Sequence, residues 1–218
     1  MKVFKNYRSK IKKILNKYGF GPGKKTNLND YLSKYNNLDK LHLGCGNIYI
    51  KGWVNVDVLQ TGATDIVMDI KKLPGIKHNS VKEIYACHVL EHFSTKEVIE
   101  ILRRWNQVLI PGGKLRISVP DLDAITRIYQ KNIKHFQTPG NQPWVALIYG
   151  GQKDEYDFHK TGFNECWLKY ILEKNDYEKA ERYENNPHFI GDMIDNSLAN
   201  LPFGEYISLN MLCYKKVY

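Results

Sequence analysis

The sequence predicts an α/β fold in which helices cover both faces of a mostly parallel sheet. From residue 38 onward, short apolar runs alternate with amphipathic stretches, which is the pattern of successive βαβ units. A glycine-rich turn, Gly44-Cys45-Gly46, follows the first run, and the next two runs end on Asp57 and Asp69. Ligands of open parallel sheets bind at the carboxyl ends of the strands, so these groups predict a ligand site at that edge.

The expected sheet has seven strands, and the last two form an antiparallel hairpin around the long loop 184–204. Ser94 is expected to cap one helix, and Asn164 another over residues 165–174. The expected strands are Leu41–Leu43, Trp53–Val56, Asp65–Met68, Glu83–Cys87, Lys114–Val119 (after a tight turn at Pro111-Gly112-Gly113), Tyr177–Tyr183 and Glu205–Tyr214.

The formal net charge of +9 comes from the N-terminal segment. Residues 1–25 hold nine of the 32 Lys and Arg residues and no acid, so the remaining 23 basic residues balance the 23 acidic ones. A nucleic-acid enzyme would carry a basic patch on its folded body as well, so this distribution argues against nucleic acid. Residues 2–18 have the spacing of a basic amphipathic helix. This helix either lids the domain with its apolar face or docks weakly on an anionic membrane or a partner.

Chain length and cysteine usage indicate one domain in a reducing compartment. We expect the basic helix and its linker in residues 1–37 and one folded domain in residues 38–218. The four cysteines show neither a disulfide framework nor metal-ligand spacing. No apolar run reaches membrane-spanning length and no secretory signal is recognisable, so a cytoplasmic location is expected.

The predicted ligand site suits a nucleoside more than a dinucleotide. Asp57 ends the second strand, where a carboxylate can accept both hydroxyls of a ribose, and Asp69 ends the third, near where an adenine amino group would lie. The alternative is that both aspartates only cap the turns that follow them. A dinucleotide site would have a third glycine in G-x-G-x-x-G, but position 49 is Tyr49, so nicotinamide and flavin cofactors are disfavoured.

Four segments resemble the motifs of class I S-adenosylmethionine-dependent methyltransferases. They are Leu41-His42-Leu43-Gly44-Cys45-Gly46, Gly52-Trp53-Val54-Asn55-Val56-Asp57, His88-Val89-Leu90-Glu91-His92 and Leu109-Ile110-Pro111-Gly112-Gly113. Residues 149–163 also resemble a motif of the branch found in polysaccharide and glycan biosynthesis, whose members are sometimes fused to glycosyltransferases in bacteria and large algal viruses. The resemblance spans residues 38–172. It implies a Rossmann-like methyltransferase fold, S-adenosylmethionine as cofactor with S-adenosylhomocysteine as product, a small-molecule or glycan acceptor, and association with glycosyltransferases.

The resemblance also implies a role for individual residues in binding the cofactor. Gly44 and Gly46 would admit its methionine part, and Asp57 would hold its ribose. Asp69 and the Ile70 backbone would bind its adenine. The full set that the resemblance implies is His42, Gly44, Cys45, Gly46, Asp57, Val58, Asp69, Ile70 and His88.

Two chemical points remain open. His42 stands where the family has an acidic residue, so how the ammonium of the cofactor is bound is not explained. A sugar hydroxyl is a poor nucleophile, so O-methylation needs a general base beside an aligned methyl. The candidates, in order, are His88 beside the methyl, Asp121 after the fifth strand and His159 in the long insertion. The alternatives are that His88 only positions the cofactor or starts the turn, that Asp121 only caps a turn, and that His159 only forms a hydrogen bond within its own loop. No metal site is assigned, because the Asp-x-Asp of Asp121 and Asp123 is too common to indicate one.

Residues 120–164 are expected to form an acceptor-recognition lid, since the segment is too long for a simple connection. The residues expected to stack on a sugar ring or bond its hydroxyls are Tyr129, Trp144, Tyr149, Tyr156, Phe158, Phe163, Asp154, Glu155 and Asp157. The alternative is that the aromatic residues close a small core under the loop. We therefore expect methylation of a sugar hydroxyl on a glycan or a nucleotide-linked sugar. The alternatives are an N- or O-methyltransferase of another small metabolite and a non-catalytic cofactor-binding module.

Overall fold

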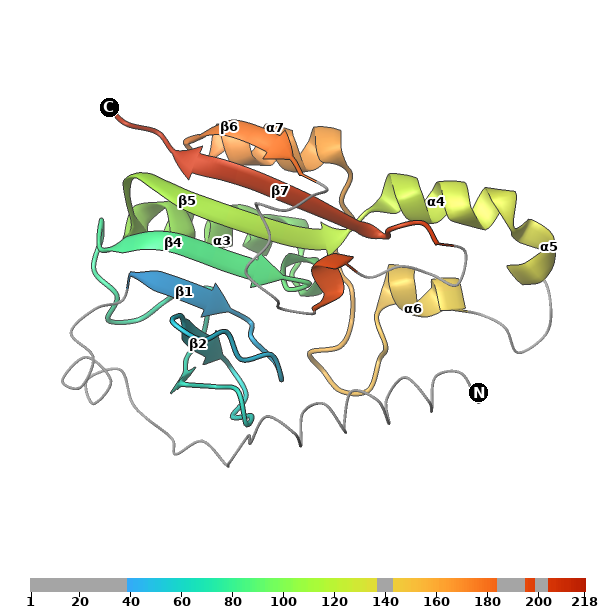
Figure 1. Cartoon of the computed structure of the whole chain (residues 1–218), viewed down its shortest axis with the longest axis horizontal. Helices are drawn as coiled ribbons and strands as arrows, with labels where there is room; N and C mark the ends of the chain where they lie inside the picture. The colour runs from blue at the N-terminus through green and yellow to red at the C-terminus, as the bar shows by residue number, and fades with distance from the viewer. Residues whose placement is uncertain (1–38, 137–142, 184–194, 199–203) are drawn as a thin grey trace.

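The computed structural model describes residues 39–136, 143–183, 195–198 and 204–218. Its seven strands form one sheet in the order β3-β2-β1-β4-β5-β7-β6. β7 runs antiparallel to both of its neighbours, and every other strand pair is parallel (Figure 1). The strands are β1 (Lys40–Leu43), β2 (Val54–Asp57), β3 (Ile66–Val67), β4 (Val81–Cys87), β5 (Leu109–Pro120), β6 (Tyr177–Arg182) and β7 (Ser208–Lys215). The predicted mostly parallel sheet with an antiparallel end is confirmed.

The helices surround the sheet and extend beyond its carboxyl edge. α3 and α7 lie behind the sheet in Figure 1, η2 lies in front, and α4, α5 and α6 project past the strand ends. The helical elements are η1 (Leu90–His92), α3 (Thr95–Val108), α4 (Leu122–Lys131), α5 (Ile133–Phe136), α6 (Pro143–Tyr149), α7 (Glu165–Lys174) and η2 (Asn196–Leu198). Both predicted caps are confirmed: Ser94 and Glu97 form a capping box on α3, and the Asn164 side chain accepts from Trp167 N.

Two strands start three or more residues away from the predicted position, and the other bounds differ by at most two residues. β5 starts at Leu109, which pairs with Val81, whereas Lys114 pairs with Glu83. The predicted glycine turn therefore lies inside β5 as a bulge, where Gly112 adopts φ +72°. β7 starts at Ser208 instead of residue 205, because the preceding residues turn toward α4, where Glu205 pairs with Lys131.

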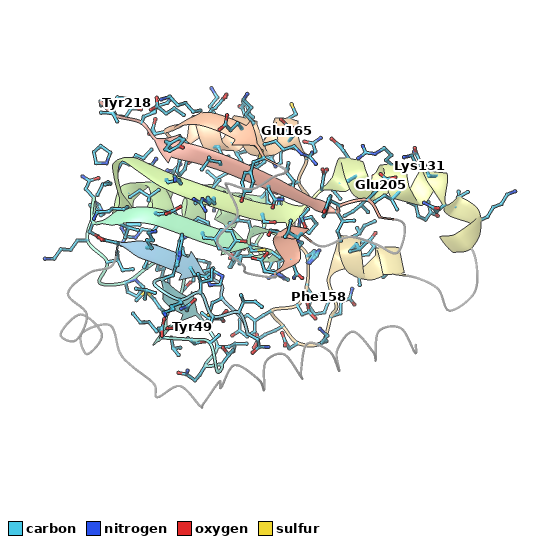
Figure 2. All side chains as sticks on the ribbon, in the orientation of Figure 1. Tyr49, Lys131, Phe158, Glu165, Glu205 and Tyr218 are labelled. Atoms are coloured by element: carbon cyan, nitrogen blue, oxygen red, sulfur yellow. The ribbon has the colours of Figure 1, made fainter. Side chains whose placement is uncertain are left out.

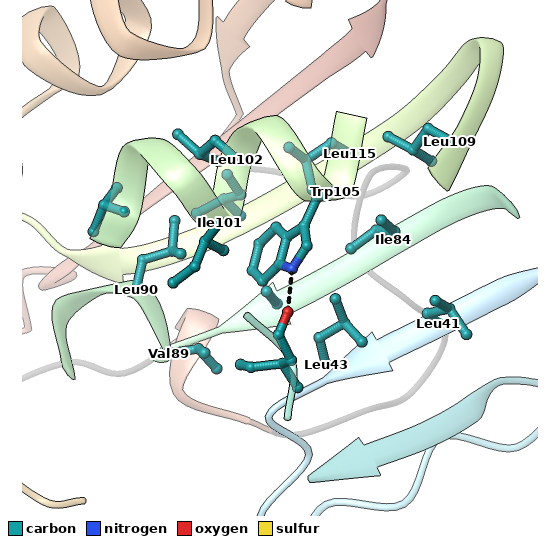
Figure 3. Packing of buried hydrophobic residues seen from close by; sticks show 14 of the residues in the cluster. Leu41, Leu43, Ile84, Val89, Leu90, Ile101, Leu102, Trp105, Leu109 and Leu115 are labelled. Atoms are coloured by element: carbon teal, nitrogen blue, oxygen red, sulfur yellow. Dashed lines mark hydrogen bonds between the residues drawn. The ribbon is translucent and has the colours of Figure 1, made fainter. Parts of the chain in front are cut away.

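The main core lies between the sheet and α3. Leu41, Leu43 and Ile84 point to this face, and Trp105 of α3 packs over them (Figure 3). The Trp105 Nε1 atom donates a 2.9 Å hydrogen bond to the carbonyl of Ile70. This bond ties α3 to the segment that follows β3, so the core and the carboxyl edge of the sheet are positioned together.

The predicted helix at residues 2–18 lies outside the described residues, which begin at residue 39. The predicted boundary between residues 37 and 38 also lies outside them. Within the described ranges, no helix has the length and apolar character needed to cross a membrane.

Replacing Trp105 with alanine is expected to lower the free energy of unfolding by about 3–5 kcal/mol, because it leaves a cavity and an unpaired Ile70 carbonyl. Urea denaturation followed by circular dichroism measures this change. Val217→Ala, at a residue that is 67% exposed, is the control and should change stability by less than about 0.5 kcal/mol. Equal stability of the two variants would contradict the prediction.

Candidate functional site

A cavity of about 620 Å³ opens at the carboxyl ends of the first four strands. This volume is in the range of small-molecule sites. Its walls come from the segments after β1, β2, β3 and β4, from α3 and from the loop after α6. The lining residues are Gly44, Gly46, Asn47, Asp57, Val58, Leu59, Thr61, Asp69, Ile70, Lys71, His88, Val89, His92, Phe93, Glu97, Glu155, Tyr156 and Lys160.

The glycine turn after β1 packs directly against the segment after β4. Gly44 has φ +70°, and a Cβ atom there would lie 2.3 Å from Val89 Cγ2. Gly46 has φ +51°, and a Cβ atom there would meet nothing within 4 Å. Gly44 is therefore required for packing, whereas Gly46 leaves open space where a ligand can approach the backbone.

Asp57 links the turn after β1 to the turn after β2. Its Oδ2 accepts from Gly46 N at 2.8 Å and its Oδ1 accepts from Leu59 N at 2.9 Å. Each carboxylate oxygen has a second lone pair, so Asp57 can cap its turn and still accept hydrogen bonds from a ligand. The capping and ligand-binding interpretations are therefore compatible at this residue.

Asp69 and Ile70 form the neighbouring wall. Asp69 Oδ1 accepts from Lys71 N at 2.9 Å, which caps the turn after β3. The Ile70 carbonyl is held by Trp105, so this backbone segment is anchored to the core. Both residues line the cavity, as does Val58 after β2, whose side chain is 43% exposed.

Two residues of the predicted cofactor set have buried side chains that do not line the cavity. His42 alternates with Leu41 and Leu43 and so faces the opposite side of β1, where its Nδ1 lies 3.0 Å from Asn55 Oδ1. Burial lowers the pKa of His42. The Cys45 Sγ atom lies 3.8 Å from Thr64 Oγ1, and burial raises the pKa of this thiol to about 12. Neither side chain is placed to contact a ligand in the cavity.

His88 lines the cavity with both ring nitrogens engaged. Its backbone has φ +53°, and its Nε2 lies 2.8 Å from Ser208 Oγ. Ser208 donates its only hydroxyl proton to the Asn196 carbonyl, so His88 Nε2 must donate to Ser208. His88 Nδ1 lies 3.2 Å from Glu91 Oε1. The ring is therefore held at the cavity wall from both sides, as a positioning group would be.

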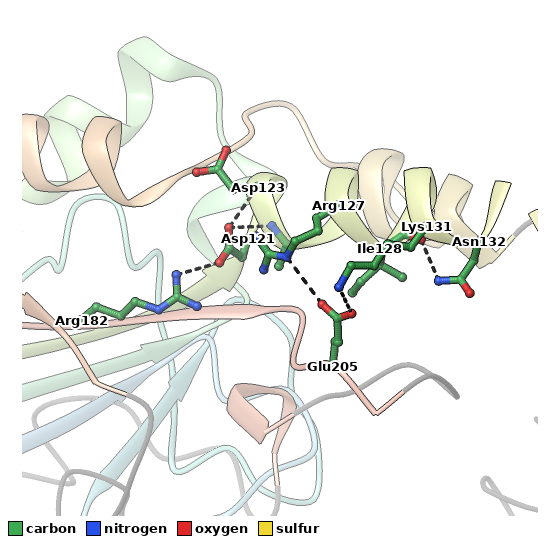
Figure 4. A network of polar contacts seen from close by, with 9 residues as sticks. Asp121, Asp123, Arg127, Ile128, Lys131, Asn132, Arg182 and Glu205 are labelled. Carbon is green, nitrogen blue, oxygen red and sulfur yellow. Dashed lines mark hydrogen bonds and ion pairs between the residues drawn. The ribbon is translucent and has the colours of Figure 1, made fainter.

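Asp121 is a structural residue outside the cavity wall. It is the N-cap of α4, and its Oδ1 accepts from Asp123 N and Ala124 N at 3.0 and 3.2 Å. Its Oδ2 accepts from Arg182 Nη1 at 2.9 Å (Figure 4). Both oxygens are thus occupied within the fold, which matches the capping alternative. The role of Asp121 as a general base stays a prediction.

The third candidate base, His159, lies against His92, which belongs to the segment after β4. The His159 and His92 rings meet edge to face at 5.0 Å, and His92 lines the cavity. His159 Nδ1 donates to the Leu147 carbonyl at 3.1 Å, and burial lowers the pKa of His159. His88 and His92 are four residues apart in the turn after β4, and this spacing is the sequence feature that indicates that both histidines face the cavity.

The insertion contributes only part of its predicted acceptor set. Glu155 and Tyr156 line the cavity, together with Lys160. Phe163 is fully buried in the main core, and Tyr129 packs with Ile125 and Ile128 in a small separate core. These two aromatic residues follow the core alternative.

The remaining residues of the predicted set fold the loop or lie at its surface. Asp154 accepts from Tyr156 N at 2.9 Å and Asp157 accepts from Gly151 N at 3.3 Å. Tyr149 and Phe158 are exposed, and Phe158 lies on the loop after α6 (Figure 2). The side chain of Trp144 lies outside the described set.

Known proteins match this chain in one sequence segment and in the overall fold. A family profile described as a methyltransferase domain matches residues 54–117. No curated protein matches the sequence.

Solved methyltransferase structures resemble the fold at low sequence identity. A SAM-dependent methyltransferase from Methanosarcina mazei is 16% identical with a TM-score of 0.53, over 88% of this chain and 100% of that one. The Burkholderia thailandensis 1,6-didemethyltoxoflavin-N1-methyltransferase, with bound 1,6-didemethyltoxoflavin and S-adenosylhomocysteine, is 14% identical with a TM-score of 0.51, over 85% and 75%. The chain covers 52% of the CurJ carbon methyltransferase chain, with 87% of its own length, 13% identity and a TM-score of 0.49. The predicted Rossmann-like methyltransferase fold is confirmed.

Asp121→Asn is expected to lower the free energy of unfolding by about 1–3 kcal/mol. Asparagine still caps α4, but the Arg182 charge loses the Asp121 carboxylate at 2.9 Å and keeps the Glu165 carboxylate at 3.9 Å. The cost stays below that of a fully buried pair because the Arg182 side chain is 27% exposed. Urea denaturation measures it, with Asp123→Asn, an exposed residue in the same turn, as control. Similar losses in the two variants would show that the ion pair does not stabilise the fold.

Proposed function

We propose that this chain is an S-adenosylmethionine-dependent methyltransferase that binds its cofactor in the cavity at the carboxyl edge of the sheet. The observation that supports this most is the meeting of three successive strand ends, with Gly46, Asp57 and Asp69, on one cavity wall. The methyltransferase-domain profile and the methyltransferase fold agree with it. The Burkholderia enzyme, which shares the fold, was solved with S-adenosylhomocysteine bound.

The cavity wall offers a partner for each part of the cofactor. The open space at Gly46 suits the methionine part, and the free lone pairs of Asp57 suit the ribose hydroxyls. Asp69 and the Ile70 backbone are assigned to the adenine amino and ring nitrogens, and the exposed Val58 side chain to the adenine face. His42 and Cys45 are omitted from this assignment because their side chains face away.

Methyl transfer is an in-line displacement. An acceptor oxygen forms a bond to the methyl carbon while the carbon–sulfur bond breaks, its electron pair stays on sulfur, and the acceptor proton leaves to a base. Alignment of the two reactants supplies much of the acceleration. His88, braced by Ser208 and Glu91 at the end of β4, is assigned to fix the reacting end of the cofactor.

The acceptor we propose is a sugar hydroxyl of a glycan or a nucleotide-linked sugar. Tyr156 offers a ring for stacking, and Glu155 and Lys160 offer a carboxylate and an ammonium for hydroxyl groups on the same wall. The resemblance of residues 149–163 to a glycan-biosynthesis motif supports a cytoplasmic role beside glycosyltransferases. The second candidate is another small metabolite, because the Burkholderia thailandensis enzyme that shares the fold is by name an N1-methyltransferase of 1,6-didemethyltoxoflavin.

Calorimetric titration with S-adenosylmethionine and S-adenosylhomocysteine tests the cofactor, and labelled-methyl transfer into a panel of sugars and glycan fragments tests the acceptor. Absence of binding at millimolar cofactor would overturn the proposal. Cofactor binding with no transfer to any sugar would favour the second candidate or a non-catalytic binding module.

Asp57→Asn is expected to weaken S-adenosylmethionine binding by about 10- to 100-fold, because hydrogen bonds from the ribose to a charged carboxylate are lost. Calorimetry measures the dissociation constant, and thermal unfolding checks that the variant is folded. Asp65→Asn is the matched control, since Asp65 accepts from Asn55 and does not line the cavity. Equal affinities of the two variants would remove Asp57 from the site.

A further inference from the structure

The turn after β4 and the loop after α6 bring together a carboxylate and two imidazoles that the proposed cofactor does not use. These groups are Glu91, His92 and His159. One potential ligand atom from each lies within 4.8 Å of those of the other two. His92 also lines the cavity, so the cluster borders the site.

We propose that Glu91, His92 and His159 bind a divalent transition-metal ion at the cavity wall. Two neutral imidazoles and one carboxylate form a recurrent ligand set for zinc and non-haem iron, and this set leaves coordination positions open.

The two imidazoles are oriented as metal ligands usually are. His92 Nδ1 donates to the Phe158 carbonyl at 3.2 Å, and His159 Nδ1 donates to the Leu147 carbonyl at 3.1 Å. A carbonyl only accepts, so Nδ1 carries the proton in each ring and Nε2 keeps its lone pair. Metal-binding histidines characteristically donate their other ring N–H to a backbone carbonyl or a carboxylate in this way.

The carboxylate provides an independent indication. Glu91 is 1% exposed, and apart from the approach of His88 its carboxylate oxygens have no hydrogen-bond partner among the residues that the structure describes. In that approach, His88 Nδ1 lies 3.2 Å from Glu91 Oε1. Burying a carboxylate with so few partners is costly, and a cation beside its oxygens offsets that cost.

The backbone holds the two segments of the cluster in place. The Glu91 carbonyl accepts from Lys160 N at 2.7 Å and Thr161 N at 3.2 Å, and Thr161 Oγ1 donates to the Phe93 carbonyl at 2.7 Å. Ligand atoms about 2.1 Å from a tetrahedral zinc ion lie about 3.4 Å apart. A pair at the 4.8 Å limit must therefore close by about 1.4 Å, which requires a change of side-chain torsion when the ion binds.

A role of the ion in methyl transfer rests on the proposed function, whereas the binding of the ion does not. Through His92 the open coordination positions adjoin the cavity, where an acceptor hydroxyl would approach the methyl. Binding of that hydroxyl to the ion would lower its pKa and orient it, so that a water molecule could accept the proton in place of a side-chain base. An ion in this role would fit a site in which the His88 nitrogens and the Asp121 carboxylate already contact other groups of the fold.

The test is titration of the chelator-treated full chain with Zn²⁺ by calorimetry, without S-adenosylmethionine. We expect one zinc ion per chain, with His92→Gln and His159→Gln each weakening its binding by at least about 10- to 100-fold. His78→Gln, at an exposed histidine in the turn before β4, is the control and should bind zinc as the unchanged chain does. Equal zinc affinity in all four proteins would overturn the proposal.

X-ray absorption at the zinc edge of the unchanged chain keeps the test valid if a variant fails to fold. Nitrogen or oxygen neighbours at about 2.0–2.1 Å with imidazole scattering support the site, and a sulfur neighbour at about 2.3 Å contradicts it. A parallel S-adenosylmethionine titration separates the two proposals. Cofactor binding without zinc binding overturns only the metal site, and zinc binding without cofactor binding overturns only the proposed function.

Discussion

The close approach of Gly44 to Val89 is the constraint on which the cavity depends. A side chain at Gly44 would overlap Val89, so the turn after β1 can lie against the segment after β4 only because residue 44 has no Cβ atom. With the two segments in contact, Gly46 opens toward the ligand space and Asp57 can bond its backbone. The ends of β1, β2 and β4 then act as one rigid rim, while the Trp105 hydrogen bond holds the segment after β3 to the same core.

Most of the strands and helices could be predicted from the sequence because short stretches of neighbouring residues determine them. The two helix caps, the order of apolar runs and the aspartates at successive strand ends depend on residues close in sequence, and the structure has them where they were expected. His42 was assigned to the ligand although it alternates with Leu41 and Leu43. The two-residue period of a strand already placed its side chain on the other face, so this error came from following the motif.

The insertion could not be predicted residue by residue, since its contacts join segments far apart in the chain. Nothing in the periodicity around Phe163 or Tyr129 distinguishes a ring that stacks on a ligand from one that fills a core. The same holds for Asp57 and Asp121, since each lies at the end of a strand and caps a turn. What distinguishes Asp121 is its ion pair with Arg182, which is distant in the sequence. The meeting of His92 and His159 is likewise a product of the assembled loop.

The distribution of thiols has a practical consequence for studying the protein in solution. Burial raises the pKa of Cys45, Cys87 and Cys213, which keeps them protonated and slow to react with electrophiles. Cys166 alone among the four is exposed, on α7 beside β6, at the edge of the sheet opposite β3. A maleimide dye would therefore attach to the native chain at Cys166, which is not among the residues that line the cavity. The unmodified sequence thus offers one exposed thiol for fluorescence anisotropy or surface tethering without the introduction of a new cysteine.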